Sequence, residues 1–509
     1  MIKVYGCAIN GIAAAVVTVE VSLLPGNKIH IVGLPDSAIR ESQMRIEAAL
    51  KSNGLKRPFK RIIVNMAPAD IKKEGAAYDL PIAIALLVAS EQIQVDNIEE
   101  YLIMGELSLS GDILPVKGVL SMAVEAKKAG FTKMIVPYEN AKEAAVVEGV
   151  SVYGMKSLKD VVQLVAEEEV FPVEKVDYHD WQLKVENPKY YDFNEVKGQW
   201  NVKRAMEIAA AGGHNLILIG PPGAGKTMLA KRLGGILPPL SLDEAIETTK
   251  IHSIVGKSNH QQGLVAERPF RSPHHTISDV ALVGGGTFPQ PGEISLAHHG
   301  VLFLDELTEF KRSVLEVMRQ PLEERVVNIS RAKFSVEYPA SFMLIASMNP
   351  CPCGYYNHPE KDCVCHPGQV KKYLNKISGP LLDRIDLHVE VTPVQYNELS
   401  SDMKSESSKE IRKRVMEARE VQTSRFNDGI AFCNAQMDKQ QMSAYCKLED
   451  EAQQLMADAM GKMGLSARAY DRVLKVGRTI ADLDHSEMIQ SQHISEAITY
   501  RSLDREDWA

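Results

Sequence analysis

The chain has 509 residues, of which 45% are hydrophobic and 24% charged, the proportions of a globular protein of about three domains. It has no run of eighteen apolar residues and no N-terminal signal-peptide layout, so we expect no membrane span and a cytoplasmic location. The net charge of −8 gives no sign of nucleic-acid binding. It does not exclude such binding, because a ring-shaped motor can keep its basic residues in a central pore.

Residues 1–165 alternate between strand-like and helical patterns, which indicates an α+β or α/β domain. The strand-like runs are 15–21, 61–65 and 133–137, and the helical periodicities are 37–52 and 79–90. Residues 166–200 are first acidic and then aromatic and polar, which is typical of a linker packed on a surface. We therefore expect one N-terminal domain, followed by a linker, before residue 201.

Residues 220–227 read GPPGAGKT and fit the phosphate-binding pattern G-x-x-x-x-G-K-[ST] at every fixed position. An apolar run, 215–219, precedes this loop, and a helical pattern, 228–233, follows it, which is the strand–loop–helix context that the motif needs. The predicted ATP-binding residues are Gly220, Pro221, Pro222, Gly223, Ala224, Gly225, Lys226 and Thr227. Lys226 is expected to reach the β- and γ-phosphates, and the Thr227 hydroxyl to ligate Mg²⁺.

A second motif, Gly300-Val-Leu-Phe-Leu-Asp-Glu306, is an apolar strand that ends in two carboxylates. Such a strand is common by itself, and a surface strand with solvated acids is the alternative. Because it follows a phosphate-binding loop, we expect Asp305 to hold Mg²⁺ with its water shell. Glu306 is then the expected general base that polarises the attacking water, which turns nucleotide binding into hydrolysis.

Four of the seven cysteines gather in one irregular loop as two C-x-C pairs. They are Cys351, Cys353, Cys363 and Cys365. Four thiolates at short spacing predict a tetrahedral structural Zn²⁺ site, although each pair is tighter than the usual C-x₂₋₄-C. Disulfides and free thiols are the alternatives, and a reducing compartment disfavours the first. Cys7, Cys433 and Cys446 are scattered and are expected to be free thiols.

Further residues place 201–395 in register with AAA+ ATPases, and 396–509 then resemble their helical C-terminal lid. Asn349 in Ala346-Ser-Met-Asn-Pro350 resembles sensor 1, a polar residue that orients the attacking water. Arg384 resembles the arginine finger, which reaches the γ-phosphate bound by a neighbouring subunit, and Arg468 resembles the charged residue of sensor 2. The fold class that these motifs imply is α/β, an AAA+ P-loop core with a helical lid.

The segment 324–337 alternates apolar and polar residues around Ser-Arg-Ala-Lys, a hairpin pattern with a basic tip. In related helicases a hairpin just before sensor 1 lies in the pore and touches the DNA backbone. The resemblance thus makes Arg331 and Lys333 the candidate DNA contacts, of a kind that positions DNA without reading its sequence. An ordinary hairpin with solvated ends is the alternative.

The segments 268–276, 283–286 and 292–300 are similar to the magnesium-chelatase-like branch of AAA+ proteins. Over nearly the whole chain, the sequence is identified as a member of the YifB/ComM family of competence-associated ATPases. That resemblance implies a homo-hexameric, ATP- and Mg²⁺-dependent DNA helicase that drives branch migration on single-stranded or branched DNA during natural transformation.

Residues 1–165 resemble a Lon-protease domain, whose peptidases use a Ser/Lys dyad. In this chain the serine position falls on Ala77, in Lys73-Glu-Gly-Ala-Ala-Tyr-Asp-Leu-Pro81, and the lysine position falls on Leu120. A methyl group cannot attack a carbonyl, and leucine cannot act as a base. We therefore expect a Lon-like domain without a catalytic dyad and without peptidase activity.

Two other functions compete with the DNA motor. The first is an ATP-driven, partner-remodelling subunit of the magnesium-chelatase type, against which the Lon-like domain argues, since such subunits generally lack one. The second is a regulatory ATPase whose N-terminal domain is an adaptor for protein partners. Stimulation of ATP hydrolysis by DNA distinguishes the motor from both.

Overall fold

The computed structural model describes residues 1–167, 169–176, 181, 190–257, 263–286, 289–331, 334–358, 360–394, 405–426, 431–501 and 503. The chain divides into two compact units, and each is described by itself. Unit 1 comprises Met1–Lys184, Ser241–Ala266 and Ser330–Val336, and unit 2 comprises Val185–Leu240, Glu267–Ile329 and Glu337–Ala509. No helix in the described ranges combines the length and the apolar composition that a membrane span requires.

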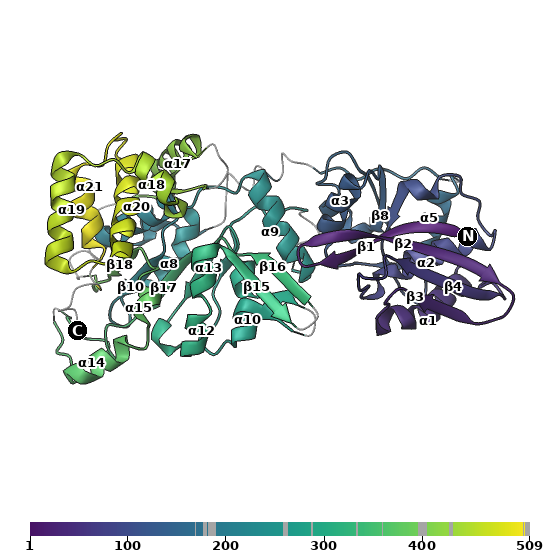
Figure 1. Ribbon diagram of the computed structural model, residues 1–509, viewed down its shortest axis with the longest axis horizontal. Coiled ribbons are helices and arrows are strands. Elements are labelled where there is room, and N and C mark those ends of the chain that lie inside the picture. The colour runs from purple at the N-terminus through teal and green to yellow at the C-terminus, as the bar shows by residue number, and fades with distance from the viewer. Residues whose placement is uncertain are drawn as a thin grey trace. The chain divides into compact units, whose positions relative to one another are not determined.

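Unit 1 is built on a seven-stranded mixed sheet with the strand order β3-β4-β2-β1-β5-β8-β9 (Figure 1). The strands are β1 (Ile2–Asn10), β2 (Ala13–Leu24), β3 (Ile29–Val32), β4 (Arg61–Ala67), β5 (Tyr101–Ile103), β8 (Lys133–Pro137) and β9 (Ser151–Met155), with a separate pair β6 (Glu106–Leu107) and β7 (Ile113–Leu114). The helices are α1 (Ser37–Ser52), α2 (Asp79–Ala89), α3 (Val119–Lys128), α4 (Ala141–Ala144), α5 (Leu158–Val165) and α9 (Leu242–Ile254).

The strands predicted in the N-terminal block form because their apolar residues alternate, so that one face of each strand meets the core. In β4 the buried residues are Ile62, Val64 and Met66, at every second position. Helix α2 is instead buried at nine consecutive residues, Asp79–Leu87, because its sequence is apolar on all sides after the first residue. These elements share one hydrophobic core within unit 1.

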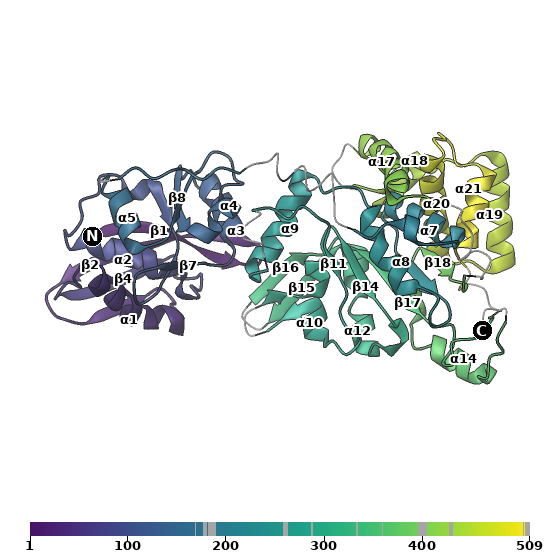
Figure 2. The ribbon, with the colours of Figure 1, turned by 180° about the vertical axis from the view of Figure 1, so that it is seen from behind.

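Unit 2 contains a five-stranded sheet with the strand order β11-β14-β17-β10-β18, in which every neighbouring pair is parallel. Figure 2 shows β11, β14 and β17 side by side. The strands are β10 (Leu216–Ile219), β11 (Phe270–Arg271), β14 (Val301–Leu304), β17 (Met343–Met348) and β18 (Leu387–Glu390), with a pair β12 (Gly284–Gly285) and β13 (Gln290–Pro291). β10, β14 and β17 are buried at every residue, as is usual for central parallel strands covered on both faces.

Unit 2 also contains helices, and the last five along the sequence lie together in one cluster (Figure 1). The helices are α7 (Trp200–Gly212), α8 (Lys226–Arg232), α10 (Asp279–Val283), α11 (Glu293–Leu296), α12 (Arg312–Glu316), α13 (Arg319–Glu324), α14 (Pro367–Leu374), α15 (Gly379–Leu382), α17 (Ser408–Arg425), α18 (Lys439–Tyr445), α19 (Asp450–Met463), α20 (Ala467–Leu483) and α21 (Ser491–Thr499). The region 396–509, predicted to be helical, contains α17–α21, and the fold class is the predicted α/β: a parallel sheet with C-terminal helices.

The compact units differ from the linear blocks of the sequence, because two segments of the predicted ATPase core, Ser241–Ala266 and Ser330–Val336, belong to unit 1. There the Ser253 hydroxyl bonds to the Glu143 carboxylate, and it accepts a hydrogen bond from Gly118 N at 3.0 Å. These contacts join residues more than a hundred positions apart, so local sequence patterns contain no sign of them. Of the predicted linker, 168, 177–180 and 182–189 lie outside the described residues.

Candidate functional site: a nucleotide pocket at the edge of the parallel sheet

A cavity of about 980 Å³ lies beside the strand ends of unit 2 and has room for a nucleoside triphosphate. In an open parallel sheet, ligands bind outside the carboxyl ends of the strands, where the following residues meet. β10, β14 and β17 end at Ile219, Leu304 and Met348. The lining residues include the predicted ones Pro222, Gly223, Ala224, Gly225, Lys226, Thr227, Asp305, Glu306 and Asn349. Gly220 and Pro221 do not line it, although their carbonyls accept from Lys226.

Lys226 is the cation that the glycine loop places in this cavity. Its Nζ donates hydrogen bonds to Gly220 O at 2.7 Å and Pro221 O at 2.9 Å, and also to Asn349 Oδ1 at 3.1 Å. Burial lowers the pKa of the Lys226 ammonium from its ordinary value, and the nearby Asp305 and Glu306 carboxylates act in the opposite direction. The ammonium is therefore held at the mouth of the glycine loop by carbonyls, a position from which it can turn to phosphate oxygens.

Thr227 and Asp305 provide paired oxygen atoms beside Lys226. The Thr227 hydroxyl donates to Asp305 Oδ2 at 2.7 Å, although the two residues are 78 positions apart in the chain. Hydroxyl and carboxylate oxygens are the ligand types that Mg²⁺ takes beside a nucleotide, so these residues fit the ion. Ser347, which the sequence reasoning did not single out, donates to Asp305 Oδ1 and holds the carboxylate from its other side.

Glu306 follows Asp305 in a left-handed backbone conformation, with φ of 53°. Non-glycine residues rarely adopt this conformation, and such residues cluster at functional sites. Its side chain is 60% exposed, and its Oε2 lies 3.4 Å from His275 Nδ1. His275 is not among the predicted site residues. The sequence feature that could have assigned His275 to this site is its position soon after β11, because the carboxyl ends of parallel strands meet at one edge of the sheet.

Asn349 directly follows β17 and meets Lys226 inside the cavity. The apolar run 341–345 before this segment is typical of a strand, and β17 continues beyond it to Met348. The strand is longer because Ala346, Ser347 and Met348 pair with β10 and are buried in the sheet. Asn349 thus enters the pocket from the end of a strand, which restrains its backbone.

Arg384 and Arg468 do not line this cavity. Arg384 is 5% exposed, and its guanidinium contacts Glu323 Oε1 at 2.6 Å. Its backbone is fixed by Asn215, whose side-chain nitrogen donates to Arg384 O at 2.9 Å. Arg468 lies in the first turn of α20, 62% exposed, with Asp383 at 3.9 Å. Neither arginine reaches the nucleotide position of its own chain in this arrangement.

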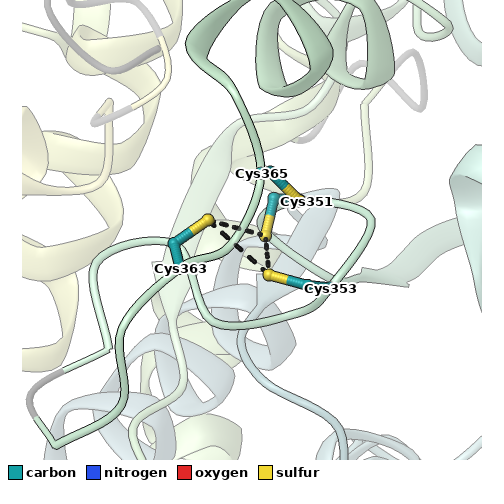
Figure 3. Close-up of side chains that lie close together, drawn as sticks. All are labelled: Cys351, Cys353, Cys363 and Cys365. Atoms are coloured by element: carbon teal, nitrogen blue, oxygen red, sulfur yellow. Dashed lines mark hydrogen bonds between the residues drawn. The ribbon is translucent and has the colours of Figure 1, made fainter.

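The four loop cysteines converge on one point (Figure 3). The Sγ atoms of Cys351, Cys353 and Cys363 are 3.3–3.7 Å apart, and all four lie within 4.8 Å of one another. A disulfide would need about 2.05 Å, whereas the edge of a tetrahedron with Zn–S bonds of about 2.3 Å is about 3.8 Å. The set of four thiol sulfurs at this spacing therefore fits a structural Zn²⁺.

The cysteine loop also contacts the nucleotide loop. Gly354 has φ of 84°, and a Cβ placed on it would lie 2.5 Å from Pro222 Cδ. Pro352, between the first two cysteines, lines the nucleotide cavity. The cysteine loop is therefore packed directly against the phosphate-binding segment.

We expect about one Zn²⁺ per chain when the protein is purified without added metal and analysed for elements. Cys353→Ser should lower this content strongly, because three thiolates and a hydroxyl hold the ion less well, while Cys446→Ser should not. Removing the ion with a chelator should also lower the Tm, since a structural Zn²⁺ contributes folding free energy. A metal content near zero in the folded wild-type protein would contradict the site.

The predicted DNA-binding hairpin is present as two paired strands, β15 (Val326–Arg331) and β16 (Phe334–Pro339). Arg331 is the last residue of β15, and only its backbone is described. Lys333 lies outside the described residues. His298, in the segment 292–300 that resembles the chelatase-like branch, is nearly buried, and its Nδ1 accepts a hydrogen bond from Ser341 N at 3.0 Å.

The two positions that the Lon resemblance assigns to the dyad, Ala77 and Leu120, lie in unit 1. Leu120 is fully buried, and its backbone N–H donates to Glu143 Oε1 at 2.9 Å. We expect no release of peptides from casein by the purified protein, with or without ATP, in an assay where an active Lon-type protease serves as the positive control. Robust ATP-stimulated cleavage by this chain would overturn the expectation.

Comparisons with known proteins agree with these observations. The family model described as magnesium chelatase, subunit ChlI, matches residues 192–399. A model described as subunit ChlI of Mg-chelatase matches residues 19–140, and one for the ChlI C-terminal region matches residues 405–501. Together these models cover the N-terminal block, the nucleotide-binding core and the C-terminal helices.

Relatives of nearly the same length are similar over the whole chain. The uncharacterized protein YifB of Escherichia coli is 45% identical over 499 residues, 97% of this chain and 96% of that protein. The competence protein ComM of Haemophilus influenzae is 42% identical over 504 residues, 99% of this chain and 97% of that protein. Lon protease 2 of Bacillus subtilis is 27% identical over 138 residues, 26% of this chain and 24% of that protein. The chain therefore belongs to the YifB/ComM family, whose members carry magnesium-chelatase-type AAA+ domains.

Proposed function

We propose that this protein is an ATP-hydrolysing DNA motor, a homo-hexameric helicase that promotes branch migration in homologous recombination during natural transformation. The observation that carries the hydrolysis is the single cavity that Lys226, Thr227, Asp305, Glu306 and Asn349 share. The assignment to DNA is supported by similarity over nearly the whole chain to a protein named competence protein ComM.

The proposed chemistry is phosphoryl transfer to water, in which positioning and charge neutralisation supply most of the rate. Lys226 holds the γ-phosphate, and Thr227 and Asp305 hold Mg²⁺, which neutralises phosphate charge when bound. Glu306 takes the proton from the attacking water, and Asn349, already in contact with Lys226, aligns that water. Arg468 in the lid helix α20 keeps its proposed sensor 2 role, although in this arrangement it does not line the cavity of its own chain.

Ring assembly follows from the proposed role of Arg384. Because it does not line the cavity of its own chain, it can serve only a neighbouring subunit's γ-phosphate in this arrangement. Hydrolysis then requires contact between copies of the chain. Arg331 and Lys333 at the β15–β16 hairpin are the proposed DNA contacts in the ring pore.

In this proposal the domains keep their predicted bounds: a Lon-like domain at 1–165, a linker at 166–200, the AAA+ core at 201–395 and the lid at 396–509. In this proposal the Lon-like domain has no peptidase activity and has a different role in the motor.

Steady-state ATP hydrolysis with single-stranded, duplex and four-way-junction DNA at two salt concentrations tests the proposal. We expect stimulation that is strongest on branched DNA and that weakens with salt, because phosphate contacts release counterions. Displacement of junction strands should then require ATP. If none of the DNA forms changes the rate of ATP hydrolysis, the protein is still an ATPase, but the DNA-motor function is refuted.

An ATP-driven protein-remodelling subunit of the magnesium-chelatase type is the second candidate. All three matching family models carry the ChlI description, which favours it. One of them covers residues 19–140, so the N-terminal block does not argue against this function as the sequence reasoning supposed. DNA-independent turnover, together with capture of a protein partner by residues 1–165, would support it.

A further inference from the structure

A loop of unit 1 gathers positive charge in a chain that is negative overall. Residues 51–61 comprise the end of α1, the loop that follows and the first residue of β4. They read KSNGLKRPFKR and contain five lysines or arginines and no acidic residue, whereas the whole chain has a net charge of −8. The loop joins α1 to β4, next to β3 at the edge of the sheet (Figure 1). It contains none of the residues assigned above to hydrolysis or to the hairpin.

Phe59 stands in the middle of this loop with its ring in solvent. At 97% exposure it is the most exposed large apolar side chain in the described part of the chain. Lys56, Lys60 and Arg61 are exposed around it, and no carboxylate of the described residues forms a salt bridge with them. An unshielded aromatic ring is costly to leave in water, and uncompensated cations beside it attract anions.

The loop is held in place by contacts at both ends. Lys56 N donates to Gln92 Oε1 at 2.8 Å, and Gln92 Nε2 donates back to Lys56 O at 2.7 Å. Arg57 Nη2 donates to Asn27 O at 3.2 Å. The neighbouring turn adds Lys28, whose carbonyl accepts from Ile62 N at 2.8 Å. Phe59 is therefore displayed by an anchored loop.

We propose that Lys28, Lys51, Lys56, Phe59, Lys60 and Arg61, the Phe59 surface, bind single-stranded nucleic acid. One base stacks on the Phe59 ring while the cations contact the flanking phosphates, the combination that single-strand-binding surfaces use. A duplex keeps its bases stacked on one another and offers no free base face to the ring. Leu24, 41% exposed, lies opposite Arg61 on β2, so an anionic membrane is the alternative that the vesicle measurement below decides. The proposal rests on the DNA-motor function and adds a second DNA contact outside the ATPase core.

Binding of fluorescein-labelled oligo(dT), and of a duplex with the same number of nucleotides, to the full-length protein tests the Phe59 surface. Phe59→Ala should weaken oligo(dT) binding about 5- to 150-fold, the range that loss of one stacked base gives, with much less effect on the duplex. Phe59→Trp should retain binding. Lys60→Gln with Arg61→Gln should lower the slope of log affinity against log salt by about 1.4, or about 0.7 for each phosphate contact.

Matched controls come from the same unit. Tyr138→Ala removes another exposed aromatic, 53% exposed with Lys156 Nζ 4.4 Å from its ring centre, and should leave binding unchanged. Lys127→Gln with Lys128→Gln removes the same charge from the exposed end of α3 and should not change the salt slope. An unchanged Tm shows that each variant folds.

Each other outcome contradicts the proposal. If the wild type binds DNA and Phe59→Ala binds oligo(dT) equally well, the Phe59 surface does not bind nucleic acid, whereas the proposed DNA-motor function is unaffected. If the variant loses oligo(dT) binding and duplex binding equally, the proposed stacking of a base on the Phe59 ring is contradicted. If the wild type binds neither DNA and DNA does not stimulate hydrolysis, the motor itself fails. Phe59-dependent binding to phosphatidylserine vesicles with unchanged oligo(dT) affinity would assign the surface to membranes.

Discussion

Replacing Arg384 by alanine is expected to reduce ATP turnover about 10³- to 10⁵-fold while ATP binding stays near the wild-type value. An arginine finger stabilises charge that develops in the transition state, so its loss appears in kcat rather than in the affinity for ATP. Because Arg384 lies outside the cavity of its own chain, the effect should be transmitted between subunits. The measurements are steady-state hydrolysis and equilibrium binding of a fluorescent ATP analogue.

The partner of Arg384 offers a matched control. Glu323→Gln removes the charge of the partner in the 2.6 Å ion pair, but it keeps an amide oxygen that can still accept a hydrogen bond from the nearly buried guanidinium. This variant should retain turnover. Mixing inactive Arg384→Ala with inactive Lys226→Ala subunits should restore part of the activity, because some interfaces then combine an intact pocket with an intact finger. Normal turnover in Arg384→Ala, or no recovery on mixing, would remove Arg384 from the proposed role.

Glu306→Gln should lower turnover about 10²- to 10⁴-fold, the usual contribution of a general base, and leave the protein able to bind ATP. The amide keeps the shape of the side chain but cannot accept the proton of the attacking water. Single-turnover hydrolysis of bound ATP measures this step directly, without a contribution from nucleotide exchange.

Glu309→Gln is the control for the Glu306 substitution. Glu309 lines the same cavity and pairs with Lys376 at 3.5 Å, but it is not at the end of β14. Its loss removes one negative charge from the pocket without removing the proposed base, so turnover should change little. Equal losses in the two variants would show that cavity charge, and not proton transfer, explains the effect.

Local patterns predicted the elements that carry the pocket. An apolar run followed by glycines indicates β10 and the phosphate loop, and an apolar run that ends in two acids indicates β14 with Asp305 and Glu306. These predictions succeed because buried parallel strands are short and apolar throughout, so their ends are visible in the sequence. The cysteine cluster was visible for a similar reason, since its members lie within fifteen residues of the chain.

The contacts across the pocket could not be predicted in the same way. Lys226 and Asn349 are 123 positions apart, and nothing in either local pattern indicates the 3.1 Å contact between them. His275 beside Glu306 was not assigned to the pocket, because β11 has only two residues and gives a weak strand pattern. Such pairs depend on the order of strands in the sheet.

The sequence by itself determined the two phosphate motifs, the fold class, the family and the four-cysteine loop, because each is written in residues that are near one another in the chain or follow a fixed order. Only the tertiary structure decided that Ser241–Ala266 packs in unit 1, that Arg384 is absent from its own chain's pocket and that Phe59 is exposed. Burial and long-range contacts arise from how sheets and helices pack together, and local periodicity does not contain that information.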